Sequence, residues 1–204
     1  KKSTKIITLA LGIMMITALL AGCDTSTASA NSDYAYIKNK GTMVIGITMY
    51  PPMNFIDVDG KLTGFDTEFA EAVCKKLGIK AEFVEINWDS KEVELNSKNI
   101  DCIWNGMCIT EERKQNMSIS DPYMNNEQAI VMKASREKEI LANVDGLTLT
   151  AEAGSTGEGK VNGSIADDGT EEVSAKAFFA NCKYVPSDSM AKALMEVKSG
   201  TADM

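Results

Sequence analysis

Hydrophobic positions recur along the chain with two alternating periods, which predict strands and helices in turn. Uninterrupted or alternating apolar runs predict strands at 42–47, 80–86, 100–104, 130–132, 147–151 and 183–185. Apolar positions spaced by four predict a helix that Asp66 caps and Gly78 ends. A weaker helix is expected at 91–97, and Ser187 is expected to cap a helix that Gly200 ends. This alternation predicts an α/β fold with a largely parallel sheet.

The α/β pattern occurs twice. A charged segment at 134–141, which reads as a linker or a surface helix, separates the two occurrences. We therefore predict a first α/β lobe at 41–132 and a second at 133–204. Residues 201–204 should open a further strand where the sequence stops, so the second lobe is expected to be incomplete and the sequence a fragment.

The N-terminal residues do not have the pattern of a folded domain. Lys1, Lys2 and Lys5 precede a run without charge from residue 6 to residue 20. That length fits the core of a signal peptide and is short for a membrane-spanning helix, so we predict a signal peptide at 1–22. Residues 24–33 are small and polar, and 23–40 is predicted to be a flexible tether.

Composition excludes several kinds of chemistry. The 204 residues carry a formal net charge of -8, which argues against nucleic-acid binding because that depends on Lys and Arg. There is no histidine, so histidine-based catalysis and histidine metal sites are excluded, and no cofactor or metal is expected. Free thiols are favoured over disulfides, although three pairings stay open, for the four cysteines Cys74, Cys102, Cys108 and Cys182.

Eight short stretches, in order, carry a resemblance to a known family. They are 41–46, 50–55, 60–66, 100–101, 106–113, 120–123, 153–156 and 198–203. Together they resemble the family-3 extracellular solute-binding proteins of polar amino-acid ABC importers. The run Leu20-Ala21-Gly22-Cys23 resembles a bacterial lipobox, which implies cleavage before Cys23, a lipid on its sulfur and an extracytoplasmic, membrane-anchored protein.

The resemblance implies a fold and a function. The fold would be the two-lobe, type II periplasmic-binding-protein fold, with a cleft between the lobes and a chain that returns to the first lobe beyond Met204. The protein would be a monomer without catalytic activity. It would capture a polar amino acid in the cleft and deliver it to an ABC permease.

The carboxylate of an amino acid requires a cationic partner. Arg113 is one of two arginines, and a guanidinium fork suits bidentate recognition of a carboxylate. On spacing alone, a surface salt bridge with Glu111 or Glu112 is an equal alternative. With the resemblance, carboxylate binding is favoured.

The remaining site residues follow from the resemblance. It implies backbone N–H groups of Cys108 and Thr156 as further carboxylate donors, with Ser155 beside them. The carbonyl of Asn105 or Gly106 would accept from the ammonium.

Two aromatic residues match positions that flank the ligand's side chain. These are Tyr50 and Trp88, for which core aromatics are the alternative. Glu152 could face the far end of the ligand, where it would favour a cationic or amide group over an acidic one; an exposed glutamate is the alternative. Many members carry an aspartate at Ile47 and a threonine at Cys108, so the ligand's identity stays open.

Two other functions remain as alternatives. A few relatives of this fold are dehydratases that act on prephenate or arogenate, and Glu152 is the one acid that could serve such a reaction. The other alternative is the extracellular ligand-sensing domain of a kinase or channel, which would need transmembrane segments after residue 204.

Overall fold

The computed structural model describes residues 32–164 and 175–204. The predicted signal peptide at 1–22 and the predicted lipid attachment site Cys23 lie outside these residues. The chain divides into two units, residues 1–36 and 37–204, and helix α2 (Asp33–Lys40) spans their boundary. This helix occupies the end of the segment 23–40 that was predicted to be a tether. Asp33 in its first turn and Lys38 and Lys40 in its last complement the helix dipole.

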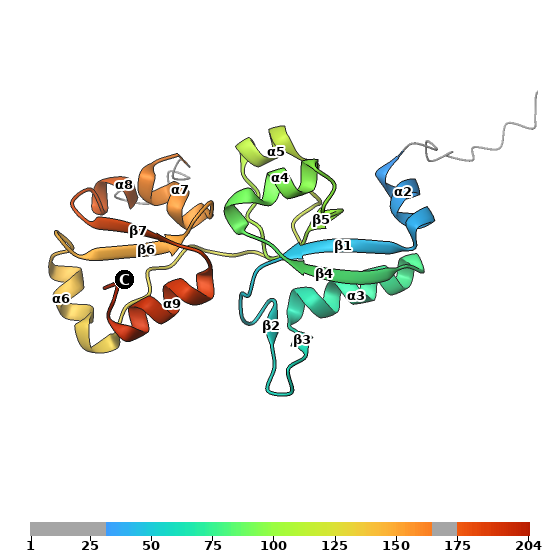
Figure 1. Cartoon of the computed structure of the whole chain (residues 1–204). Coiled ribbons are helices and arrows are strands. Elements are labelled where there is room, and N and C mark those ends of the chain that lie inside the picture. The colour runs from blue at the N-terminus through green and yellow to red at the C-terminus, as the bar shows by residue number, and fades with distance from the viewer. Residues whose placement is uncertain (1–31, 165–174) are drawn as a thin grey trace, which may run out of the picture. The chain divides into compact units, whose positions relative to one another are not determined.

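The first α/β layer is built on β1 (Thr42–Ile47). This strand lies between β4 (Lys80–Glu85) and β5 (Cys102–Ile103) and pairs with both in parallel, so that Ile45 is opposite Phe83 and Cys102 (Figure 1). Helix α3 (Phe65–Leu77) connects β1 to β4 and closes a core of Ile45, Ile47, Ala70 and Cys74. The predicted strands at 42–47 and 80–86 are confirmed, and the strand predicted at 100–104 is shorter.

Helix α3 begins two residues earlier than its sequence suggests. Gly64, with φ of 118°, occupies the N-cap, and a Cβ there would lie 2.3 Å from the Met53 carbonyl oxygen. Only glycine tolerates that backbone and that contact. The prediction that Asp66 caps the helix is therefore wrong, because Asp66 lies inside the first turn. Gly78, in the left-handed conformation, ends the helix as predicted.

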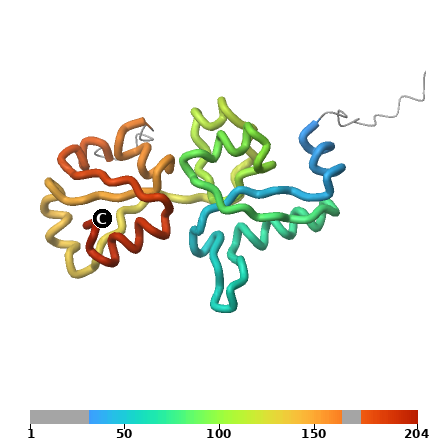
Figure 2. The backbone as a smooth tube through the Cα atoms, in the orientation of Figure 1, coloured from blue at the N-terminus to red at the C-terminus, as the bar shows by residue number. Residues whose placement is uncertain are grey.

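Several short elements complete this part of the chain. They are the antiparallel pair β2 (Phe55–Ile56) and β3 (Leu62–Thr63), the turn η1 (Trp88–Ser90), and helices α4 (Lys91–Asn96) and α5 (Glu111–Asn116). Helix α4 confirms the weak helix predicted at 91–97, whereas β2, β3 and α5 were not predicted. Residues 117–133 form no helix or strand, and Figure 2 shows them as the stretch that connects α5 to the next elements.

The second α/β layer is built on the parallel pair β6 (Thr148–Glu152) and β7 (Lys183–Ser187). Helix α9 (Met190–Ser199) packs on this pair (Figure 1), and the core contains Ile140, Val144, Leu149, Phe179 and Met204. The remaining elements are η2 (Ala134–Arg136), α6 (Glu137–Ala142), α7 (Thr156–Asn162) and α8 (Ala175–Phe178). The predicted strands at 147–151 and 183–185 are confirmed, and the lobe boundary near residue 133 stays a prediction.

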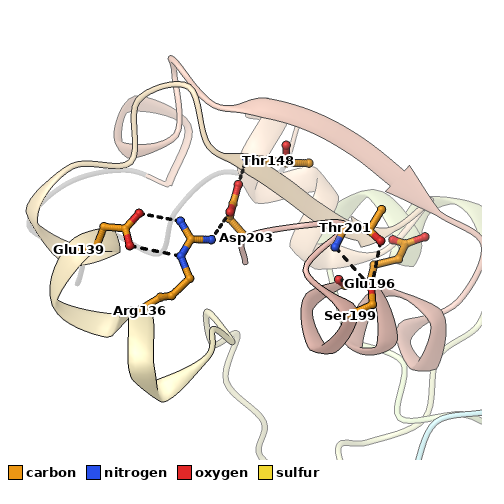
Figure 3. A network of polar contacts seen from close by, with 7 residues as sticks. All are labelled: Arg136, Glu139, Thr148, Glu196, Ser199, Thr201 and Asp203. Atoms are coloured by element: carbon orange, nitrogen blue, oxygen red, sulfur yellow. Dashed lines mark hydrogen bonds and ion pairs between the residues drawn. The ribbon is translucent and has the colours of Figure 1, made fainter.

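An aspartate fixes the start of the first strand in each layer. In the second layer, Asp203 Oδ2 accepts from the Thr148 N–H at 2.7 Å, and Oδ1 pairs with Arg136, which also binds Glu139 (Figure 3). The next residue, Met204, accepts from Thr150 N–H at 2.9 Å, so the chain runs beside β6 as the expected strand would.

The first layer has the same arrangement. Asp101 Oδ2 accepts from the Val44 N–H and from the Lys40 ammonium, both at 2.6 Å. We call these two arrangements the aspartate clasps: Asp101 with Val44 and Lys40, and Asp203 with Thr148 and Arg136.

Two further predictions from the sequence are corrected. Residues 130–132 do not form a strand: Ile130 and Val131 are exposed, and neither pairs with any strand in the part of the chain that the structure describes. Ser187 is the buried last residue of β7, and Ser189 caps α9 by accepting from Lys192 N–H at 3.2 Å.

The predicted free thiols are confirmed, because Cys74, Cys102, Cys108 and Cys182 form no disulfide. Cys74 alone among them is buried, and the other three are half-buried.

Candidate functional site

Arg113 is placed by the N-terminus of α5. The Thr110 side chain caps this helix, and its Oγ1 accepts from the Arg113 backbone N–H at 3.2 Å. The Arg113 residue is 6% exposed. A side chain on the first turn of a short polar helix would ordinarily reach into water, so its burial indicates a specific environment.

The guanidinium of Arg113 binds only neutral oxygen atoms among the described residues. Nη1 donates to the Cys108 carbonyl at 2.9 Å and lies 3.4 Å from Thr156 Oγ1, and Nη2 donates to the Gly154 carbonyl at 3.2 Å. Burial lowers the pKa of Arg113. A buried cation without a carboxylate partner is unfavourable, so the site suits an anion.

The alternative of a surface salt bridge for Arg113 is wrong. Glu111 pairs instead with Lys114 at 2.7 Å, and neither Glu111 nor Glu112 lies within ion-pair distance of the buried guanidinium.

The turn between β6 and α7 supplies the facing groups. Ser155 caps α7 by accepting from Glu158 N–H at 3.2 Å, and Glu158 Oε2 accepts from Gly154 N–H at 2.6 Å. This leaves Thr156 as the first helical residue, whose N–H has no acceptor within the helix. The predicted carboxylate donor therefore lies beside the Arg113 guanidinium.

Cys108 takes part in the site through its backbone and its thiol. Its carbonyl accepts from Arg113, and its Sγ lies 3.3 Å from Asn126 Nδ2 and 3.8 Å from Gln128 Nε2. The thiol thus contacts two amide side chains from the stretch between α5 and η2.

Lys91 belongs to the site, although the sequence did not indicate it. The residue is 5% exposed, and its ammonium donates to the carbonyls of Trp88 at 3.1 Å and of Gly154 at 3.0 Å. Burial lowers the pKa of Lys91, and the neighbouring charge of Arg113 lowers it further. Lysine on a short polar helix ordinarily indicates a solvated position, so no signal in the sequence could have found it.

Trp88 and Glu152 are both 5% exposed. The Lys91 ammonium lies 5.1 Å from the centroid of the Trp88 ring. Glu152, at the end of β6, accepts from Met190 N–H at 3.3 Å. Burial raises the pKa of Glu152, against the effects of the Met190 N–H, the Thr48 hydroxyl and Lys91. The alternative of an exposed glutamate is therefore wrong.

Asn105 and Gly106 contact residues of the segment that follows β1. The Asn105 amide donates to the Thr48 carbonyl at 2.9 Å and to Asn54 Oδ1 at 2.6 Å, and its Oδ1 accepts from the Thr48 hydroxyl at 2.7 Å. Gly106 has φ of 61°, and a Cβ there would lie 3.6 Å from Tyr50 Cε1. This network fixes the backbone whose carbonyls were predicted to meet the ligand's ammonium.

The structure brings several of the predicted residues into contact. Gly154 and Lys91 link Arg113 to Trp88, and Thr48 binds Asn105. Ile47, where many members of the resembled family carry an aspartate, is a core residue of β1. Within 32–164 and 175–204, no cluster of cysteine and carboxylate residues could hold a metal, and no helix is long and apolar enough to cross a membrane.

Comparisons with known proteins identify relatives of this chain. The model of the bacterial extracellular solute-binding proteins, family 3, matches residues 43–204. The L-cystine-binding protein TcyJ of Escherichia coli is 37% identical over 127 residues, which are 61% of this chain and 47% of that protein. The L-cystine-binding protein TcyA of Bacillus subtilis is 31% identical over an alignment of 205 positions, which covers 96% of this chain and 70% of that protein.

A solved structure of an amino acid-binding protein is also similar to this chain. The ancestral amino acid-binding protein AncCDT-1, described as a precursor of cyclohexadienyl dehydratase, superposes with a TM-score of 0.72 at 33% identity, covering 84% of this chain and 72% of that one. This neighbour confirms the two-lobe fold. The match to TcyJ spans about half of that relative's length. The chain belongs to family 3 of the bacterial extracellular solute-binding proteins.

Proposed function

We propose that this protein is the substrate-binding component of an ABC importer, which captures a polar amino acid and delivers it to a membrane permease. The observation that carries the proposal is the buried Arg113 guanidinium, whose partners among the described residues are all neutral oxygens. The carboxylate of an amino acid would supply the missing negative charge. The names of the cystine-binding relatives support an amino acid as the ligand.

The proposed ligand contacts are divided between its charged groups and its side chain. Arg113 and the N–H groups of Cys108 and Thr156 would bind the carboxylate, with Ser155 fixing the turn that presents Thr156. A carbonyl of Asn105 or Gly106 would accept from the ammonium. The side chain would lie between Tyr50 and Trp88, with Glu152 at its far end.

The proposal includes a location outside the cytoplasm. A signal peptide at 1–22 would be cleaved, and a lipid on Cys23 would anchor a monomeric protein to the membrane. The order of basic residues, apolar run and Leu20-Ala21-Gly22-Cys23 supports this. Mass spectrometry of the protein from its membrane fraction would detect the lipid, and Cys23→Ser should release the protein from the membrane.

Thermal melting of the full-length protein against the twenty amino acids, cystine and ornithine tests the proposal. A ligand that binds only the folded state stabilises it by about 2.7 kcal/mol at a hundred times its dissociation constant. We expect one or two polar amino acids to raise Tm, and the carboxamide of the same amino acid to have no effect. If no amino acid raises Tm, the proposal is wrong.

Matched variants identify the group that binds the carboxylate. Arg113→Ala should abolish the ligand-induced rise in Tm, and Arg113→Lys should reduce it because an ammonium lacks the guanidinium fork. Lys114→Ala removes an exposed cation from the next position and should leave the rise unchanged. Circular dichroism of each variant checks that the fold is retained.

A dehydratase is the second candidate function. Its support is the buried Glu152, whose raised pKa suits a general acid, together with the likeness to AncCDT-1. The test is turnover of prephenate or arogenate by the full-length protein, with Glu152→Gln as the inactive control. Absence of turnover would contradict this candidate, and turnover that survives Glu152→Gln would contradict the role of Glu152.

A further inference from the structure

The ammonium of Lys91 lies between Trp88 and Gly154, two residues next to the proposed ligand site. It is within hydrogen-bond distance of the Gly154 carbonyl, at 3.0 Å, and the Arg113 guanidinium is 3.2 Å from the same oxygen. Both cations therefore meet at one acceptor. In the described part of the chain, neither cation forms an ion pair with a carboxylate, although Glu92, Asp89 and Glu152 act on Lys91 from a longer distance.

The same ammonium covers the ring that is proposed to contact the ligand's side chain. Its nitrogen is 5.1 Å from the Trp88 centroid, a cation–π distance. Trp88 is 5% exposed, so a ligand must displace a covering group before it can stack on the ring. Lys91 thus occupies the place that a cationic ligand side chain would take.

We infer that Lys91 is a specificity-determining residue that excludes amino acids with a positively charged side chain. A second cation beside Trp88 would meet a like charge in a site shielded from water, where Coulomb repulsion is several times stronger than in bulk solvent. A neutral side chain of the same shape meets no such repulsion. This inference rests on the proposed function.

Lys91 also reduces the range of ligand groups that we expect Glu152 to favour. That carboxylate alone would favour a cationic or an amide group at the far end of the ligand. Lys91 and Glu152 also influence each other's pKa from a distance, so the positive charge of Lys91 opposes the attraction of Glu152 for a ligand cation. An uncharged polar group, such as an amide or a ureido group, fits both residues.

Binding of L-arginine and L-citrulline to the full-length protein tests the inference. The two ligands have nearly the same shape, and citrulline carries a neutral ureido group where arginine carries a guanidinium. Calorimetric titration of the wild-type protein should give a citrulline affinity at least about tenfold above that for arginine. Lys91→Met removes the charge and keeps the length of the side chain, so it should reduce this ratio at least about tenfold.

Two control variants separate local from general effects. Lys91→Arg keeps the positive charge and should keep the preference for citrulline. Lys114→Met removes a half-exposed cation that pairs with Glu111, and should leave the ratio unchanged. Melting of each variant without ligand shows whether it is folded.

The possible results distinguish the inference from the proposed function. If arginine binds the wild-type protein as tightly as citrulline does, or if Lys91→Met leaves the ratio unchanged, the inference is overturned and the proposed function stands. If the wild-type protein binds only other amino acids, Lys91→Met must gain arginine binding, and no gain overturns the inference. If no amino acid binds, both fail.

Discussion

The Tyr123 hydroxyl donates a hydrogen bond to Asp66 Oδ1 at 2.9 Å, although the two residues are 57 positions apart in the sequence. Asp66 is fully buried on α3, and its second oxygen has no hydrogen-bond partner in the described structure. The Tyr123 ring is stacked among Phe65, Phe69 and Trp104. This bond therefore ties the stretch after α5 to the first core.

We expect Tyr123→Phe to destabilise the protein. The ring contacts remain, but a buried carboxyl group loses its hydroxyl partner, which costs about 1–3 kcal/mol in the free energy of unfolding. Urea unfolding at neutral pH measures the loss. Tyr34→Phe, at an exposed position of α2, is the control and should change stability by less than about 0.5 kcal/mol. Equal effects of the two substitutions would contradict the role of the bond.

Asp66 should also give the protein a dependence on pH. Burial raises the pKa of Asp66 in the folded state, although the hydrogen bond from the Tyr123 hydroxyl opposes this shift. The folded state then binds a proton more tightly than the unfolded state does. The stabilisation is complete below the unfolded pKa of about 3.9 and is lost as pH rises through the folded pKa.

The variant Asp66→Asn removes this titration. Its stability relative to the wild-type protein should therefore improve as pH increases from about 4 to 7, because only the wild-type carboxyl group ionises. Urea unfolding of both proteins across this range measures the difference. A difference that is constant with pH would show that Asp66 titrates alike in both states.

Gly154 should be intolerant of a side chain. Its φ is 69°, and a Cβ would lie 2.8 Å from Asp89 Cα, a backbone atom that cannot move aside freely. Gly154→Ala should therefore displace the carbonyl that Lys91 and Arg113 share, and lower both stability and amino-acid affinity.

A second glycine provides the matched control for that substitution. Gly146 has φ of 78°, and nothing lies within 4 Å of its Cβ position, so Gly146→Ala carries the backbone strain without the clash. We expect Gly154→Ala to be the more destabilising by about 1–3 kcal/mol in urea unfolding. Equal losses would mean that backbone strain alone accounts for both.

Much of the fold could be predicted from the sequence because most of its longer strands are continuous or alternating apolar runs. This signal is strong at 42–47 and weak at 55–56 and 62–63, where two-residue strands leave no detectable period. The apolar run at 130–132 led to a wrong strand prediction for a different reason. Its hydrophobicity favours a strand, but a strand forms only where the backbone of a second strand is available for hydrogen bonding.

The candidate site could be predicted in part. Arg113 and Thr156 were found through their motifs, and the structure places them 3.4 Å apart. Lys91 could not be found, because its role depends on a carbonyl 63 residues away. Composition and hydrophobic periodicity report on residues that are close in the sequence. The burial of a cation depends on residues that are close in space and can be far apart in the sequence.

The two aspartate clasps have a consequence for how the molecule unfolds. Asp101 lies between α4 and β5 and binds the backbone of β1, and Asp203 follows α9 and binds the backbone of β6, so each clasp lies within one layer. Each layer also has its own apolar core. We therefore expect the two layers to unfold as separate cooperative units. Their backbone amides would then exchange with deuterium at two distinct rates.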